Sequence, residues 1–363
     1  MEETFITSIK INKVRHLEGL EIRLSDTDRK HLILTGKNGS GKTSVLEAIN
    51  KGLYRRYKHD RPSDSNIDLG LNMDKSAVFM PFAPFFFDSK RNTNFIESKG
   101  PQKIPFKYGE SVDKINPYFV QHLVNLRYDR LDFKDQDSVK EVETIDTWFN
   151  EFTNLLKEIF DDNNLEIQFN RADYNFYISI KNHEVFSLNQ LSDGYRAVLD
   201  IVSELLMRSA GKAIHAYDLQ GIVLIDEIET HLHIDLQKKI LPFLTSFFPK
   251  IQFIVTTHSP FVLSSVDNAV IYDLEKQQSI EDLSDYSYQE IVETYFGKDQ
   301  YSDIVKRKLS EYEILIEKEV RNDEEEDKLY ELRKYFRKLP FFLSSELQLK
   351  IQSLELYPET THA

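Results

Sequence analysis

The chain has 363 residues, of which 40% are apolar and 12% aromatic, enough for a substantial hydrophobic core. It contains no cysteine, which excludes disulfides and thiolate zinc sites and is typical of a reducing cytoplasm. The formal net charge is −14, so the average surface repels nucleic-acid phosphates and any contact with DNA must be local.

Residues 36–43, GKNGSGKT, match the phosphate-loop pattern G-x-x-x-x-G-K-[ST]. In such a loop backbone N–H groups face phosphate oxygens, the lysine reaches the β- and γ-phosphates, and the hydroxyl binds Mg²⁺. The apolar run 31–35 predicts a strand before the loop, and apolar residues at helical spacing predict a helix over 44–57 after it. The sequence therefore predicts a site for a nucleotide and Mg²⁺, with Thr43 also binding the metal. The predicted nucleotide ligands in the loop are Gly36, Asn38, Gly39, Ser40, Gly41, Lys42, Thr43 and Ser44.

Residues 58–165 lack sustained heptads and are expected to form a compact insertion. Its longest apolar stretch, residues 77–87, is too short and too interrupted by proline to span a bilayer, so we expect a cytoplasmic protein without a membrane partner. Apolar positions between residues 148 and 160 predict an amphipathic helix, interpreted as core or as a partner-docking face. The basic residues of 51–61 suit the C-terminus of the preceding helix and leave a local DNA contact as the alternative.

A second helix is predicted over residues 193–208, after the stretch LNQLSDGYR. Ser192 or Asp193 can cap its N-terminus, and a helix start with a small residue and a glycine is an anion site. By itself this segment indicates only an N-cap. The apolar face of the helix is Val198, Ile201, Val202, Leu205 and Leu206.

Two apolar runs, residues 222–225 and 251–255, predict buried parallel strands. Asp226 and Glu227 follow the first strand and His258 follows the second, and ligands bind at the carboxyl ends of strands in open α/β sheets. We expect Asp226 to hold Mg²⁺ through its water shell, and Glu227 to orient or deprotonate an attacking water. His258 is interpreted as a contact to the γ-phosphate, with a structural role as the alternative.

In chain order, GKNGSGKT, LSDGYR, IVLIDE and TTHSP resemble the head of ABC-type ATPases, and more closely its SMC-like and overcoming-lysogenization-defect-like branch (the AAA_15 and AAA_21 groups). The resemblance covers roughly residues 1–55 and 185–275. It implies ATP with Mg²⁺ as cofactors and two heads that dimerise head to tail. Ser192 and Gly194 of one protomer would then close on the γ-phosphate held by the other, and His258 would sense that phosphate.

Two departures from the transporter-like pattern point to a subfamily. Tyr195 follows the signature glycine where transporters usually have glutamine, and IETHLH follows Glu227. Both features resemble the stand-alone ATPases of the Septu, retron and PARIS antiphage systems. The glutamine loop of ABC-type ATPases is not placed, since neither Gln102 nor Gln121 follows a convincing strand.

The expected fold is α/β: an ABC-type P-loop NTPase head with a mixed N-lobe sheet and a parallel core sheet, a compact α/β insertion and a C-terminal helical extension. We expect the head to span residues 1–275, with the insertion at about 58–165, and the extension, for assembly or partner docking, to span 276–363. The function implied is an ATP-hydrolysing switch that forms a homodimer or higher homo-oligomer and regulates a separately encoded effector, such as an HNH nuclease, in antiphage defence. The alternative is an SMC-like DNA-repair ATPase that binds DNA directly.

Overall fold

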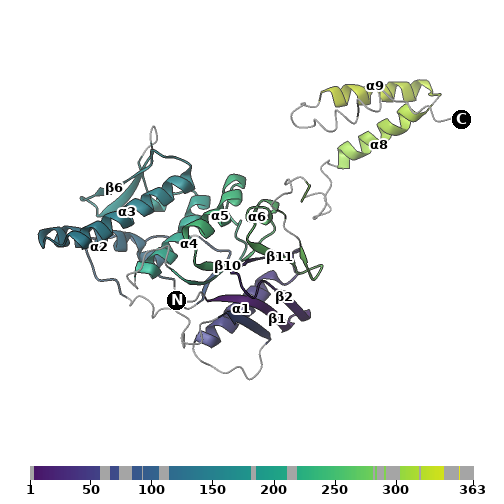
Figure 1. The fold of residues 1–363 in the computed structure, drawn as a ribbon. Helices are drawn as coiled ribbons and strands as arrows, with labels where there is room; N and C mark the ends of the chain where they lie inside the picture. Colours follow the sequence, from purple (N-terminus) through teal and green to yellow (C-terminus); the bar gives the residue numbers. More distant parts are fainter. Residues whose placement is uncertain are drawn as a thin grey trace. The chain divides into compact units, whose positions relative to one another are not determined.

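The computed structural model of the chain separates into two compact units, residues 1–288 and 289–363 (Figure 1). It describes residues 4–57, 66–72, 84–91, 93–105, 114–180, 185–210, 219–280, 283, 290–291, 303–318, 320–338 and 351. Most of the apolar stretch 77–87 and part of the basic stretch 51–61 lie outside the described residues.

An antiparallel sheet of three described strands forms the N-lobe. Its order is β2 (Leu17–Arg23), β1 (Phe5–Val14), β4 (Ile67–Asn72). In β1, Ile9 and Ile11 are buried, and the residues between and after them are exposed, which is the alternation of a strand with one covered face.

The core sheet has the order β12-β11-β3-β10-β9-β5. Its strands are β12 (Gln278–Ile280), β11 (Ala269–Asp273), β3 (His31–Thr35), β10 (Ile251–Thr256), β9 (Gly221–Ile225) and β5 (Phe85–Phe87). All neighbours pair in parallel except β11 and β12. Every residue of β3, β9 and β10 is buried, because both faces of the sheet are covered. The three strands predicted from apolar runs are confirmed.

Helix α1 (Lys42–Tyr57) packs between the two sheets. Its apolar side chains Val45, Leu46, Ile49 and Leu53 are fully buried and form one core with residues of β1, β3, β9 and β10. Burial of this stripe fixes the start of α1 directly after the phosphate loop.

Two long helices, α2 (Phe119–Asp135) and α3 (Val139–Phe160), precede a small antiparallel sheet. The predicted aromatic face of α3 is core: Phe152 is buried and meets Phe119 of α2 edge to face at 5.3 Å between ring centroids. The small sheet comprises β6 (Glu166–Asn170), β7 (Asn175–Ser179) and β8 (Phe186–Ser187). The remaining helices of this unit are α4 (Asp193–Ala210), α5 (Ile234–Phe247) and the short α6 (Pro260–Leu263).

The α/β class is confirmed, and four details differ from the sequence expectation. The N-lobe sheet is antiparallel in every described pairing, and the antiparallel strand β12 makes the core sheet mixed. Strand β12 lies beyond residue 275, so the sheet continues past the predicted end of the head. Within residues 58–165, β4 pairs with β1 and β5 pairs with β9, so part of the predicted insertion belongs to the two sheets.

The second unit contains the helices α8 (Asp303–Glu317) and α9 (Asp323–Arg337). Asn322 caps α9, accepting a hydrogen bond from the N–H of Glu325, whose side chain accepts one from the Asn322 N–H. The buried residues of this unit include Leu309, Tyr312, Leu329, Leu332 and Phe336. Among the described residues of the chain, no helix is long and apolar enough to cross a membrane.

Candidate nucleotide-binding site

The phosphate loop joins the end of β3 to the start of α1. Gly36, Gly39 and Gly41 have φ angles of 133°, 84° and 100°, a region that residues with a Cβ rarely adopt. A Cβ on Gly36 would lie 2.9 Å from Oγ of Ser40, and that buried hydroxyl has no hydrogen-bond partner in the described part of the chain. The loop is therefore a tight cradle that only glycine can build.

Lys42 is the first residue of α1 and is buried within the loop. Its ammonium donates to the carbonyl oxygens of Gly36 (2.9 Å) and Lys37 (3.2 Å). Burial lowers its pKa, and the nearby carboxylates of Glu227, Glu229 and Asp226 oppose that shift. The positive charge thus lies where a polyphosphate would follow the loop.

Asp226 lies at the carboxyl end of β9 and is 5% exposed. Its Oδ2 accepts a hydrogen bond from Oγ1 of Thr43 at 3.0 Å, and its Oδ1 accepts one from Oγ1 of Thr256 at 2.6 Å. The predicted metal ligands Thr43 and Asp226 are therefore adjacent, although they are 183 positions apart in the chain. A hydroxyl next to a carboxylate, both oxygen donors, is a donor set suited to Mg²⁺.

Glu227 is the second residue of the turn after β9, residues 226–230. Its φ is 46°, in the left-handed region, and its N–H donates to Oγ1 of Thr256 at 2.7 Å. Its side chain is partly exposed, and Oε2 accepts from Oγ1 of Thr230 at 3.2 Å. The carboxylate therefore keeps contact with solvent.

His258 follows β10 and is half-buried. Burial lowers its pKa and the charge of Lys42 lowers it further, whereas the carboxylates of Glu229, Glu227 and Asp226 oppose that shift. Its backbone N–H donates to Oε1 of Glu229 at 2.6 Å, and Oγ1 of Thr257 donates to Oε2 of the same carboxylate at 2.8 Å. Glu229 therefore anchors the segment that carries His258.

The signature segment, residues 191–196, lies at the start of α4. Ser192 and Asp193 are exposed, and Gly194 packs against the chain after the turn, where a Cβ would lie 3.1 Å from the carbonyl oxygen of His231. The ring of Tyr195, the departure noted in the sequence, stacks on Phe160 with centroids 4.1 Å apart. The serine of this segment is thus exposed, while Gly194 and Tyr195 are packed against neighbouring residues.

The structure brings together Lys42, Thr43, Asp226, Glu227 and His258 at the carboxyl ends of β3, β9 and β10. It places Ser192 directly before α4 and Gly194 in the first turn of that helix, against residues 231–236.

Three residues that the sequence analysis did not single out also shape this site: Thr256, Glu229 and Arg91. Thr256 lies in TTHSP and Glu229 in IETHLH, both at strand ends. The additional polar residues at these strand ends could have identified them as candidate site residues. Arg91 is far from any motif, and nothing in the sequence links it to the turn.

Neither candidate for a glutamine loop reaches these groups through its hydrogen bonds. Gln121 is buried, and its Nε2 donates to the carbonyl of Gly100 and to the side chain of Asn125. The backbone N–H of Gln102 donates to the same Asn125 side chain. Both glutamines thus hold together the segment around α2.

The residues present fit a nucleotide with Mg²⁺. The glycine cradle and Lys42 suit phosphates, the unpartnered Ser40 hydroxyl is a donor at the loop, and Thr43 with Asp226 suits the metal. In the described part of the chain, no group of three or more His, Cys, Asp or Glu side chains could hold a metal ion.

Comparison with known proteins places the chain in a family. The profile of the family AAA_21, described as "AAA domain, putative AbiEii toxin, Type IV TA system", matches residues 57–264, more than half of the chain. The chain belongs to this family. The resemblance to P-loop ATPases predicted from the sequence is thereby confirmed.

Three relatives match the chain over different lengths. The chain is similar to the Septu protein PtuA of Bacillus mycoides (strain KBAB4), with 24% identity over 314 residues, 76% of this chain and 41% of that protein. Its identity to the Septu protein PtuA of Bacillus thuringiensis is 22% over 377 residues, 90% of this chain and 91% of that protein. The Retron Ec83 probable ATPase of Escherichia coli is 39% identical over 118 residues, 32% of this chain and 21% of that protein. The matches thus span less than half the length of two of these relatives.

Among solved structures, the chain is similar to an SMC head bound to the C-winged helix domain of ScpA. The identity is 14% and the TM-score 0.42, over 77% of this chain and 95% of that one.

Proposed function

We propose that the protein binds ATP with Mg²⁺ and hydrolyses it at the site formed by the phosphate loop and the turn after β9. The observation that carries this proposal is the contact between Thr43 and Asp226 at 3.0 Å, with Glu227 next in the chain. Metal ligand, phosphate-binding lysine and a candidate base thus lie at one edge of the sheet. This is the set of groups that phosphoryl transfer to water requires.

Each residue has a separate role in the proposed reaction. The loop N–H groups and Lys42 bind the β- and γ-phosphates, and Thr43 and Asp226 hold Mg²⁺, Asp226 through its water shell. The metal, when bound, neutralises the charge that develops on the phosphate oxygens. The Glu227 carboxylate orients the attacking water in line and accepts its proton. The neutral His258 imidazole donates a hydrogen bond to the γ-phosphate.

We further propose that the pocket is completed by a second copy of the chain. Ser192 and Asp193 are exposed at the N-terminus of α4, and a helix N-terminus favours an anion. In a head-to-tail dimer, Ser192 and Gly194 of one protomer close on the γ-phosphate held by the other. ATP binding then closes the dimer and phosphate release opens it.

The output of this switch is proposed from the relatives. Resemblance to Septu and retron proteins supports a role in bacterial antiphage defence, in the cytoplasm, where the protein controls a separately encoded effector such as an HNH nuclease. We assign assembly or partner docking to the C-terminal residues, 276–363. Co-purification from the native operon tests this part, and an operon product that never associates with the protein in any nucleotide state argues against it.

Steady-state phosphate release from ATP and Mg²⁺ tests the enzyme. Wild type should turn over, and Lys42→Ala should lose nucleotide binding together with turnover. Glu227→Gln should keep binding but lower kcat on the order of 10²-fold or more, since it removes the base but no phosphate contact. In sedimentation, ATP should shift Glu227→Gln to a stable dimer. Unchanged turnover in this variant would refute the assignment of Glu227.

A further inference from the structure

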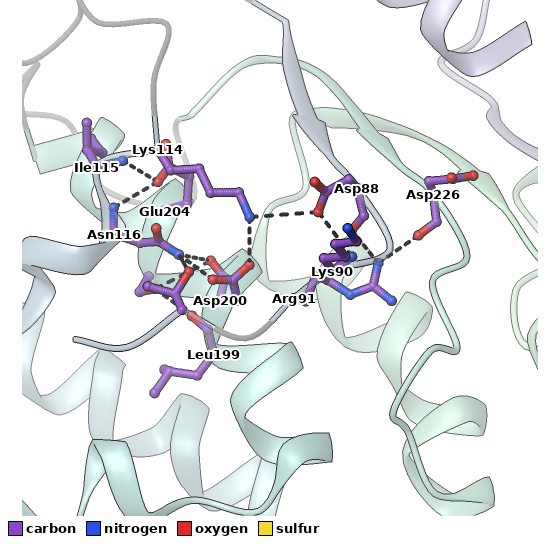
Figure 2. Close-up of polar contacts among 12 residues, drawn as sticks. Asp88, Lys90, Arg91, Lys114, Ile115, Asn116, Leu199, Asp200, Glu204 and Asp226 are labelled. Carbon is purple, nitrogen blue, oxygen red and sulfur yellow. Dashed lines mark hydrogen bonds and ion pairs between the residues drawn. The ribbon is translucent and has the colours of Figure 1, made fainter. Parts of the chain in front are cut away.

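A buried arginine lies beneath the turn that carries the proposed base. Arg91, which follows β5, is 1% exposed. Its Nη1 donates to the carbonyl oxygen of Asp226 at 2.8 Å (Figure 2). Its Nη2 donates to the carbonyl oxygen of Glu227 at 2.5 Å and, at 3.5 Å, to that of Thr230. One guanidinium thus binds three carbonyls of residues 226–230.

The free-energy cost of burying this cation must be offset by the interactions that it makes. Removing a guanidinium from water is costly, and burial lowers the pKa of Arg91, whereas the charges of Glu229, Asp200 and Asp226 raise it. Its Nε has no hydrogen-bond partner among the described residues. The hydrogen bonds that the side chain does make are directed at backbone carbonyls and so fix peptide orientation.

The conformation that Arg91 binds is a strained one. Glu227 is a non-glycine residue at a φ of 46°, and such conformations persist only where the surroundings hold them. Arg91 donates to the carbonyls of Asp226 and Glu227, which lie on either side of the Glu227 Cα. The N–H of Glu227 donates to Thr256. Because both flanking peptides are fixed, the direction of the Glu227 Cα–Cβ bond is fixed as well.

The loop that carries Arg91 is itself anchored to α4. Nζ of Lys114 lies 4.0 Å from Oδ1 of Asp88 and 3.5 Å from Oδ2 of Asp200, which is fully buried on α4 (Figure 2). Asn116 donates to the Asp200 carboxylate at 2.7 Å. Arg91 therefore extends from a braced loop and does not move freely with the turn.

We propose that Arg91 is a positioning residue for ATP hydrolysis, which holds the turn 226–230 so that the Glu227 carboxylate is directed at the attacking water. The proposal rests on the hydrolytic function proposed above. Arg91 acts through the backbone carbonyls of Asp226 and Glu227, to which it is hydrogen-bonded. Its loss should therefore lower kcat and leave ATP affinity nearly unchanged.

The test compares Arg91→Gln with Arg208→Gln. Arg208 is also a buried arginine, and it pairs with Glu204 on α4. Arg91→Gln should lower kcat on the order of 10²-fold with KM for ATP changed by less than about threefold, because a displacement of about 1 Å costs that much. Arg91→Lys, which keeps the charge but not the fork, should fall between Arg91→Gln and wild type. Arg208→Gln should stay within about threefold of wild type in kcat.

A second readout does not depend on activity. In the protein without nucleotide, amide hydrogen exchange in peptides covering residues 226–232 should quicken about tenfold or more in Arg91→Gln, because charge-assisted hydrogen bonds to the turn are lost. Arg208→Gln should leave exchange in these peptides as in wild type. If Arg91→Gln is too unstable to assay, the same exchange measurement can be made on Arg91→Lys.

The outcomes separate this inference from the function it rests on. Wild-type exchange in residues 226–232 of Arg91→Gln, or a kcat within threefold of wild type, would overturn the inference even if ATP is hydrolysed. A raised KM at unchanged kcat would overturn it as well, because Arg91 would then serve binding. Wild-type protein without any ATP turnover would overturn the proposed function, and the exchange measurement would still decide whether Arg91 holds the turn.

Discussion

Thr256→Val removes one hydroxyl that links the two acidic residues of the site. Oγ1 of Thr256 donates to Asp226 at 2.6 Å and accepts from the N–H of Glu227 at 2.7 Å, and the residue is fully buried. Valine has nearly the same shape, so the substitution removes these two hydrogen bonds and creates no cavity. Stability and turnover should both fall.

The magnitude follows from the two partners. A hydrogen bond to a charged group contributes about 1.5–3 kcal/mol, and a buried N–H left without an acceptor costs about 1–3 kcal/mol. The Glu227 N–H is only partly buried, which places its cost at the low end. We therefore expect Thr256→Val to lower the free energy of unfolding by about 3 kcal/mol.

Urea unfolding followed by tryptophan fluorescence measures this loss. The chain has a single tryptophan, Trp148 on α3, in the same compact unit as Thr256, so the signal reports on that unit. The midpoint should fall at unchanged slope, which indicates a change of stability alone. Phosphate release under conditions where the variant is folded then measures the effect on turnover.

Thr35→Val is the matched control. Thr35 ends β3, the strand next to β10, and is also fully buried, but its Oγ1 has no hydrogen-bond partner among the described residues. Removing an unpaired buried hydroxyl should change stability by less than about 0.5 kcal/mol or increase it. Equal midpoints for the two valine variants would refute the reasoning.

Two further predictions concern His31, which begins β3, and Glu229, in the turn after β9. Burial, with the nearby charges of Arg29 and Lys30, lowers the pKa of His31 from 6.5 to about 4, so its contribution to stability is complete above pH 6.5 and is lost as the pH falls toward 4. His31→Asn keeps an acceptor for the N–H of Phe253 but does not titrate. When the pH is lowered from 7 to 5, the free energy of unfolding of this variant, measured in urea, should fall by about 2 kcal/mol less than that of wild type. The same pH dependence in both proteins would contradict this. Glu229→Met removes both acceptors that hold Thr257 and His258, so it should lower the free energy of unfolding by about 2 kcal/mol and slow phosphate release. Glu18→Met, on the exposed face of β2, is the control. Equal turnover in the two variants would contradict the role of Glu229.

Much of the site could be predicted from local sequence. The runs HLILT, IVLI and IQFIV are apolar without alternation because both faces of the core sheet are covered, so strand and burial can be identified together. Polar residues directly after such runs gather at one edge of a parallel sheet. This is why Thr43 and Asp226 could be paired although they are distant in the chain.

The contributions of β5 and β12 could not be predicted in this way. Strand β5 is three phenylalanines, FFF, in an aromatic, proline-rich segment, and its pairing with β9 depends on contacts between residues more than 130 positions apart. Strand β12, QSI, is a short edge strand with exposed polar residues, held by backbone hydrogen bonds that any sequence can make. The role of Arg91 could not be predicted either, because only the pairing of β5 with β9 brings its loop beneath the turn 226–230.

The central claim is that one chain supplies half of an ATP site and a second copy supplies the rest, and mixing two inactive variants tests it most directly. Glu227→Gln disables the protomer's own pocket, and Ser192→Arg disables the pocket of its neighbour. In a head-to-tail dimer the mixed species keeps one pocket with both groups intact, so an equimolar mixture should recover up to about a quarter of wild-type phosphate release. A mixture that forms mixed dimers but releases no more phosphate than the two variants measured separately would contradict the account.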